Sequence, residues 1–205
     1  MFNRKRKIKD IVNSFHASFP FLTGNLLDAF TAMNIYLRRE RIPYLVVGSI
    51  ALRALGVPLK RACHDVDIEV IANERQEQQF KEFAQASGTH LHEQQEQALR
   101  GFAHKPYVFY YRGVQINIWV SREKFSHPRT VLINGVAFPT VDSLLRAKAT
   151  YHRPKDLEDF LYITQTLIGT ICGQENLERL MPKINIDEIQ KIILNRENDG
   201  HGEAR

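Results

Sequence analysis

Two aspartates separated by one residue are the clearest chemical signal in the sequence. Asp65 and Asp67 lie in the run "HDVDIEV", where acids alternate with hydrophobic residues as in a β-strand. Strand side chains alternate between two faces, so Asp65, Asp67 and Glu69 share one face, with neighbours about 7 Å apart. Such carboxylates can bind Mg²⁺, which takes one or two of them and completes its shell with water and phosphate oxygens. The pattern predicts a half-buried strand with an open, anionic face.

A second signal is Gly48-Ser49, which follows the apolar run 43–47 and precedes helix-forming residues. Ser49 is placed to cap a short helix that Gly56 ends. Backbone N–H groups and the positive dipole end at a helix start can bind phosphate. A phosphate cradle beside a cation site is what phosphoryl-type transfer requires. Read alone, the acids would equally describe an edge strand with a solvated face.

Together these motifs resemble the nucleotidyltransferase superfamily, whose fold is that of polymerase β. Its signature is a strand, Gly-Ser opening a helix, and D-h-D-h (h, hydrophobic) on the next strand. The corresponding segments here are "VVGSIALRAL" and "HDVDIEV", and the resemblance covers about residues 43–120. It implies an α/β (α+β) fold with a mixed sheet flanked by helices. It also implies that Asp65 and Asp67 are catalytic and bind Mg²⁺ or Mn²⁺, and that Gly48 and Ser49 bind an NTP.

A second block, "LLRAKATYHRPKDLEDFLYI", resembles the Lys…Arg-x-Lys-Asp-x-x-Asp segment of bacterial abortive-infection and toxin-type nucleotidyltransferases. Some small-molecule antibiotic nucleotidyltransferases carry a similar block. By this resemblance Lys148 contacts nucleotide phosphates, with Arg153 and Lys155 in the same binding set, and Asp156 or Asp159 places or deprotonates the acceptor. Helical spacing puts Asp159 on one face with both Lys155 and Asp156. A surface helix pair stabilised by i,i+4 ion pairs would show the same spacing.

The third carboxylate of the family, expected on a later central strand, is replaced by Asn117 in "GVQINIWV". An amide oxygen can bind a metal, but it carries no charge and is a poor general base. Three interpretations stay open. Asp65 and Asp67 hold the metal alone with a C-terminal acid such as Asp156 as base, Glu69 substitutes in part, or the protein binds nucleotide without turnover.

The elements that must position these residues follow from periodicity and turn signals. Apolar residues recur at helical spacing over 8–15 and 26–37, and a helix is expected from an Asn73 cap to Gly88. Hairpin turns are expected at Arg112-Gly113 and Asn134-Gly135. From Thr140 onward only helices are expected, one of them opened by Pro154, with weaker ones over 175–181 and 187–195.

This order of elements predicts two folded parts. We expect an α/β domain over residues 1–139, with N-terminal helices to about residue 40. A helical C-terminal subdomain is expected over 140–195, and the polar segment 196–205 is expected to be a disordered tail.

Composition describes an ordinary globular chain of 205 residues, 43% hydrophobic and 25% charged. No run reaches the ~18 apolar residues that span a bilayer, and we expect no secretory signal in the basic N-terminal segment. We therefore expect a cytoplasmic protein with no membrane partner, in which Cys63 and Cys172 are reduced thiols. The net charge of +5 suits a polyanionic partner such as an NTP.

Three functions compete. The first is metal-dependent transfer of a nucleoside monophosphate from an NTP to an acceptor (tRNA or other RNA, protein or small molecule) with release of pyrophosphate; a toxin-like version would act with a small partner protein. The second is a catalytically inactive nucleotidyltransferase-fold protein that binds nucleotide or a partner, Asn117 marking the lost activity. The third is a basic nucleic-acid-binding protein in which Asp65 and Asp67 are merely solvated. Pocket shape and loops choose the acceptor, so the motifs leave it open.

Overall fold

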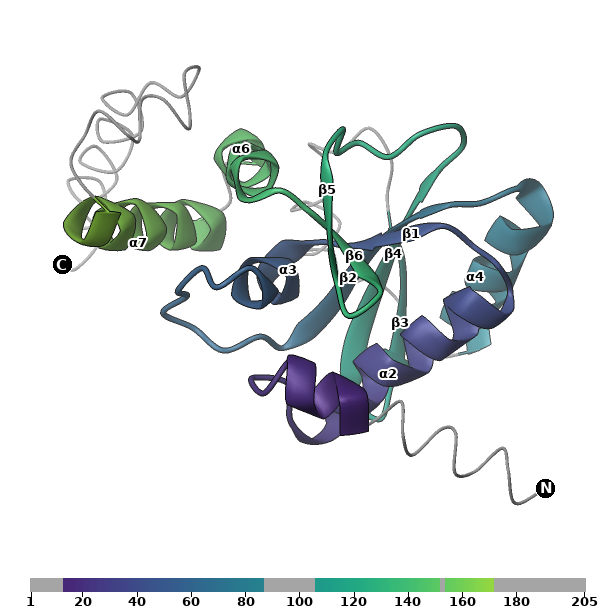
Figure 1. Cartoon of the computed structure of the whole chain (residues 1–205). Helices are drawn as coiled ribbons and strands as arrows, with labels where there is room; N and C mark the ends of the chain where they lie inside the picture. Colours follow the sequence, from purple (N-terminus) through teal and green to yellow (C-terminus); the bar gives the residue numbers. More distant parts are fainter. Residues whose placement is uncertain (1–12, 87–105, 152–153, 172–205) are drawn as a thin grey trace, which may run out of the picture. The chain divides into compact units, whose positions relative to one another are not determined.

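The computed structural model describes residues 13–86, 106–151 and 154–171. Residues 13–18 are helical and are followed by the elements drawn in Figure 1: α2 (Gly24–Arg39), β1 (Tyr44–Val46), α3 (Gly48–Ala54), β2 (Asp65–Ile71), α4 (Glu74–Ala86), β3 (Tyr107–Tyr111), β4 (Val114–Ser121), β5 (Thr130–Ile133), β6 (Val136–Pro139), α6 (Val141–Tyr151) and α7 (Pro154–Ile171). Gly88, Arg153, Cys172, the helices expected over 175–181 and 187–195, and the tail 196–205 lie outside the described residues.

Four of the strands form one mixed sheet in the order β1-β2-β4-β3. β2 runs antiparallel to β1 and parallel to β4, and β3 runs antiparallel to β4. β5 and β6 form a separate antiparallel pair. The mixed sheet with its helices confirms the expected α/β class. Because β2 pairs on both sides, the edge-strand interpretation of Asp65 and Asp67 is wrong.

The two faces of the four-stranded sheet differ in chemistry. On one face Val66, Ile116 and Phe109 lie in register across β2, β4 and β3, and all three are buried. Phe109 contacts Phe83 of α4, with ring centroids 5.8 Å apart. The Phe83 ring also contacts Tyr36 of α2, with ring centroids 5.4 Å apart. Helices α2 and α4 therefore lie together on this apolar side (Figure 1), and the acids of β2 point to the other side.

Both expected hairpin turns are present. Arg112 and Gly113 have φ angles of 52° and 78°, and Asn134 and Gly135 have φ angles of 49° and 74°. Two consecutive residues in the left-handed region are what a two-residue hairpin turn matching the strand twist requires. The turns thus join β3 to β4 and β5 to β6 at the positions expected from the sequence.

Of the three expected helix starts, those at Asn73 and Pro154 are confirmed, since α7 begins at Pro154, and the one at Ser49 is wrong. The Asn73 side chain accepts a hydrogen bond from the backbone of Gln76, whose side chain accepts one from the backbone of Asn73. This reciprocal pair is a capping box. Helix α3, by contrast, has Val47 as its N-cap residue and no side-chain cap. Ser49 lies inside the first turn because the helix already begins at Gly48.

An aromatic cluster joins the N-terminal helical residues to the β5–β6 pair. Phe19 packs edge-on against Phe30 of α2 and Phe138 of β6, with ring centroids 5.5 and 5.7 Å apart. Phe15 contacts Phe30 at 5.6 Å, and all four rings are buried. Edge-to-face pairs of this kind add stability beyond the apolar area that they bury.

The chain divides into one compact unit over Met1–Ile163 and a second over Thr164–Arg205. The first unit contains both sheets, α6 and the part of α7 that carries the acids expected at the site. The boundary expected between residues 139 and 140 stays a prediction. None of the helices in the described ranges has the length and apolarity needed to cross a membrane.

The segment between β4 and β5 is held by a buried carboxylate and a histidine. Glu69 accepts hydrogen bonds from the Ser121 hydroxyl (2.9 Å) and from the backbone (2.6 Å) and hydroxyl (2.7 Å) of Ser126. His127 Nδ1 lies 2.6 Å from the hydroxyl of Ser143 on α6. Burial lowers the pKa of His127, and the charge of Glu69 opposes this shift only in part. His127 is therefore neutral in the folded protein near pH 7.

We predict that His127 makes the protein less stable in acid. Its pKa is lower in the folded than in the unfolded chain, so the unfolded chain binds the extra proton and stability falls as pH drops through about 6.5. The free energy of unfolding in urea should therefore fall more between pH 7.5 and 5.5 in the wild type than in His127→Gln, whose amide can still bond Ser143. An equal fall in both proteins would contradict the assignment.

Candidate functional site

The Gly48 and Asp67 motifs meet through a contact that only glycine permits. Gly48 has a φ of 68°, in the left-handed region, and a Cβ built there would overlap Asp67 Oδ2 and lie 3.1 Å from its Cγ. The backbone N–H of Val47 donates to the carbonyl of Asp67 at 2.9 Å, which continues the β1–β2 pairing to this point. The first turn of α3 therefore abuts the Asp67 carboxylate, and the two motifs lie on the adjoining strands β1 and β2 and the turn between β1 and α3.

Asn117 occupies the position expected for the third carboxylate. It lies directly opposite Asp67 in the parallel pair of β2 and β4. Its Nδ2 donates to Asp67 Oδ1 at 2.7 Å, and its Oδ1 accepts from Gln115 Nε2 at 2.9 Å. The Tyr110 hydroxyl in turn donates to Gln115 Oε1 at 3.2 Å. An ionised carboxylate only accepts hydrogen bonds, so Asp67 sets the direction of this chain and Asn117 presents an N–H to it.

Asp65 and Asp67 are half-buried on the face opposite the apolar side of the sheet. Within the described ranges, no three His, Cys, Asp or Glu side chains form a group that could hold a metal ion. Two carboxylates nevertheless fit Mg²⁺, because that ion usually keeps several waters and substrate phosphates in its shell. The residues present thus fit a site with two protein carboxylates and no third acid.

The expectation of an open acidic face is wrong at Glu69. Its side chain is buried, with 4% of its surface exposed, and its two oxygens accept the hydrogen bonds from Ser121 and Ser126. A carboxylate so engaged anchors the segment after β4. Glu69 therefore does not stand in for the missing third acid.

Ser49 and Cys63 lie together in the interior. Ser49 is 3% exposed, and within the described part of the chain its hydroxyl has no nitrogen or oxygen partner. Burial raises the pKa of the Cys63 thiol, and the neighbouring Ser49 hydroxyl and the charges of Arg53 and Arg61 reduce that rise. Cys63 is thus a protonated thiol, and Ser49 lies beside it in the interior.

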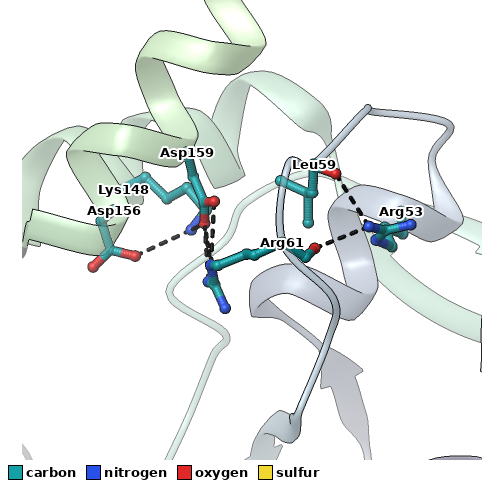
Figure 2. A network of polar contacts seen from close by, with 6 residues as sticks. All are labelled: Arg53, Leu59, Arg61, Lys148, Asp156 and Asp159. Carbon is teal, nitrogen blue, oxygen red and sulfur yellow. Dashed lines mark hydrogen bonds and ion pairs between the residues drawn. The ribbon is translucent and has the colours of Figure 1, made fainter.

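The acids of α7 and the lysine of α6 form a buried ion-pair cluster (Figure 2). Lys148 Nζ donates to Asp156 Oδ1 at 3.1 Å and to Asp159 Oδ2 at 2.8 Å. Asp159 also accepts from Arg61, from Nε at 3.2 Å and from Nη2 at 2.9 Å. Lys148, Asp156 and Asp159 were expected on one site, and the structure brings them together with a fourth residue, Arg61.

The loop that leads into β2 is held by hydrogen bonds to α3 and to α7. Arg53 of α3 donates through Nη2 to the carbonyls of Leu59 (3.1 Å) and Arg61 (2.9 Å), while the Arg61 side chain holds Asp159 of α7. Figure 2 shows this path from α3 through the loop to α7. The cluster therefore fixes the segment that ends at Asp65.

Two residues of the expected binding set, Arg153 and Lys155, remain, and the described one, Lys155, is not part of this buried cluster. Lys155 lies exposed on α7, although helical spacing placed it one turn from the buried Asp159. Arg153 lies outside the described residues. Arg61 and Gln115 were missed by sequence reasoning, and the one available signal for Arg61 was a charged pair, Lys60-Arg61, in an otherwise apolar loop just before the acids.

Comparisons with known proteins add little. No family model and no curated protein matches the chain. Among solved structures, an antigenic nucleotidyltransferase-like protein from Paracoccidioides brasiliensis is similar at 16% identity and a TM-score of 0.36, over 78% of this chain and 89% of that one.

We predict that Gly48→Ala destabilises the protein more than Gly56→Ala. Both glycines have positive φ, which costs another residue about 1–2 kcal/mol. Only Gly48 faces a side chain, since a Cβ at Gly56 would have nothing within 4 Å. Forcing a methyl group against Asp67 should add about 1–3 kcal/mol. Urea unfolding measures both, and equal losses would show that the Gly48–Asp67 contact is not tight.

We also predict that Lys148→Met lowers the free energy of unfolding by about 3 kcal/mol, because it leaves charged carboxylates buried without their ammonium partner. Lys155→Met, on the exposed side of α7, should change stability by about 0.5 kcal/mol or less. Urea unfolding at pH 7 compares the two. A loss below about 1 kcal/mol for Lys148→Met would mean that the cluster is open to water.

Proposed function

We propose that this protein is a metal-dependent nucleotidyltransferase that moves a nucleoside monophosphate from an NTP to an acceptor. The observation that carries this proposal is the contact between the Gly48 backbone and the Asp67 carboxylate. It joins a strand–Gly–Ser–helix turn to a pair of carboxylates on an interior strand. A triphosphate lying against the turn would then have its reacting phosphorus beside Asp65 and Asp67.

Asp65 and Asp67 would hold the Mg²⁺ or Mn²⁺ ion. When bound, such an ion neutralises the charge of the triphosphate and of the leaving pyrophosphate. Asn117 serves this site as a positioning group, since its N–H holds one oxygen of Asp67 in place. The contact with Gly48 limits movement of the carboxylate on its other side.

The proposed reaction is an in-line displacement. An acceptor oxygen forms a bond to the α-phosphorus, the bond from that phosphorus to the oxygen bridging to the β-phosphate breaks, and pyrophosphate leaves. The acceptor proton passes to a carboxylate, for which Asp156 and Asp159 are the proposed groups. Both are bonded to Lys148, and Asp159 is bonded to Arg61 as well, so Asp156 is the group that can exchange its contact with Lys148 for the acceptor.

The rest of the binding set follows the same resemblance. Lys148, Arg153 and Lys155 are proposed to bind the nucleotide together with Gly48 and Ser49. The acceptor is an RNA such as tRNA, a protein or a small molecule. We also propose that a small partner protein controls the activity and that the protein acts in the cytoplasm.

A second candidate is supported by one observation. Asn117 donates from Nδ2 to Asp67, and its Oδ1 already accepts a hydrogen bond from Gln115. Asn117 therefore offers the site neither the negative charge nor the unoccupied oxygen of the third carboxylate that the resemblance led us to expect. A protein that binds nucleotide or a partner without turnover would retain the Gly48–Asp67 contact and lack that third acid.

Transfer from α-³²P-labelled NTPs tests the proposal directly. The purified protein is incubated with each NTP, Mg²⁺ or Mn²⁺, and separate pools of RNA, protein and small metabolites. We predict label in one pool, its loss with EDTA, and a drop of at least about 100-fold in Asp65→Asn and Asp67→Asn, because loss of either carboxylate charge weakens ion binding.

Glu123→Gln, an exposed acid after β4, serves as the control and should transfer at the wild-type rate. Transfer retained in both aspartate variants would refute the site. Nucleotide bound with no transfer to any pool would favour the second candidate.

A further inference from the structure

Arg61 is the accessible cation of the cluster on α6 and α7. Its side chain is 32% exposed, whereas the Lys148 side chain is 8% exposed and directs its ammonium at two carboxylates. Asp156 and Asp159 are buried behind these cations. The cluster therefore presents a guanidinium rather than an ammonium or a carboxylate to an approaching ligand.

The guanidinium is oriented by its own ion pair. Nε and Nη2 both donate to Asp159, which holds the planar group along one edge. Five N–H groups are available on arginine, and within the described part of the chain Nη1 donates to nothing. A guanidinium held in this way loses little freedom when it binds a second anion.

Arg61 is close to the candidate site along the chain and is held there from both sides. Burial lowers the pKa of the guanidinium, but the hydrogen bond and charge of Asp159 and the charges of Asp65 and Asp156 outweigh this, so its pKa is raised. The charge of Asp65 thus contributes to the raised pKa of Arg61. The chain links them as well, since Arg61 is four residues before Asp65 and Arg53 holds the Arg61 carbonyl.

We propose that Arg61 binds phosphate oxygens of the nucleotide triphosphate beside Asp65, with Asp159 as the residue that positions its guanidinium. This inference rests on the proposed function and adds a binding residue to it. Arginine matches phosphate geometry through parallel N–H donors, and the edge not used by Asp159 supplies them. Lys148 bonds the same carboxylate and so helps to keep Asp159 in place for Arg61.

Calorimetric titration with Mg²⁺ present tests the assignment on the full chain, using each NTP and inorganic tripolyphosphate. We expect Arg61→Gln to weaken binding of the NTP and of tripolyphosphate by about 10- to 100-fold, the usual effect of losing a hydrogen bond to a charged group. The loss on tripolyphosphate distinguishes a phosphate contact from a contact to the base. Unchanged affinity for both ligands would overturn the proposal.

Arg53→Gln is the matched control, because it releases the carbonyls of Leu59 and Arg61 and so loosens the same loop without removing the Arg61 charge. It should retain affinity within about threefold. An equal loss in Arg53→Gln and Arg61→Gln would assign the effect to the loop and overturn the proposal.

Arg61→Lys decides the question if Arg61→Gln does not fold. Lysine retains a charge for Asp159 but lacks the second edge, so binding about tenfold weaker supports the proposal and unchanged binding refutes it. If the wild-type protein binds no NTP, both the proposed function and this inference are refuted. If the wild-type protein and the Arg61 variants bind NTP equally well, only this inference is refuted.

Discussion

The candidate site depends on the buried carboxylate of Asp159. Two cations from different parts of the chain, Lys148 and Arg61, bond it at 2.8 and 2.9 Å. Burying a carboxylate costs free energy unless it is paired with a cation. Removing either cation would therefore destabilise the fold, and this keeps both cations at the carboxylate. As a result, α6, α7 and the loop before β2 are joined at Asp159. Asp65 follows that loop directly, four residues after Arg61.

Asp67 is positioned by a different device. One carboxylate oxygen accepts an N–H from Asn117, and the other lies against the Gly48 backbone. The amide chain from Tyr110 through Gln115 to Asn117 has a single direction because its last acceptor is a carboxylate. Asn117 thus orients Asp67, whereas the acid that the resemblance led us to expect at this position would repel it.

Several features near the site were predictable from short stretches of sequence. The strand of Asp65 and Asp67, the Asn73 cap and the turn at Arg112-Gly113 all depend on residues within a few positions of one another, and all are confirmed. The error at Glu69 came from a partner remote in the sequence. Glu69 was expected on an open face, but it meets Ser126, 57 residues later, in the interior.

The sequence by itself determined the class of the fold, the local elements, and the placing of the acids of β2 on one face, because backbone geometry and hydrophobic period act over a few residues. Only the tertiary structure decided which charges are buried and which are exposed. Asn117 meets Asp67 across 50 residues and Arg61 meets Asp159 across 98. Contacts at such separations depend on how strands and helices pack, and no local pattern of charges indicates that Lys148 is buried while Arg61 is partly exposed.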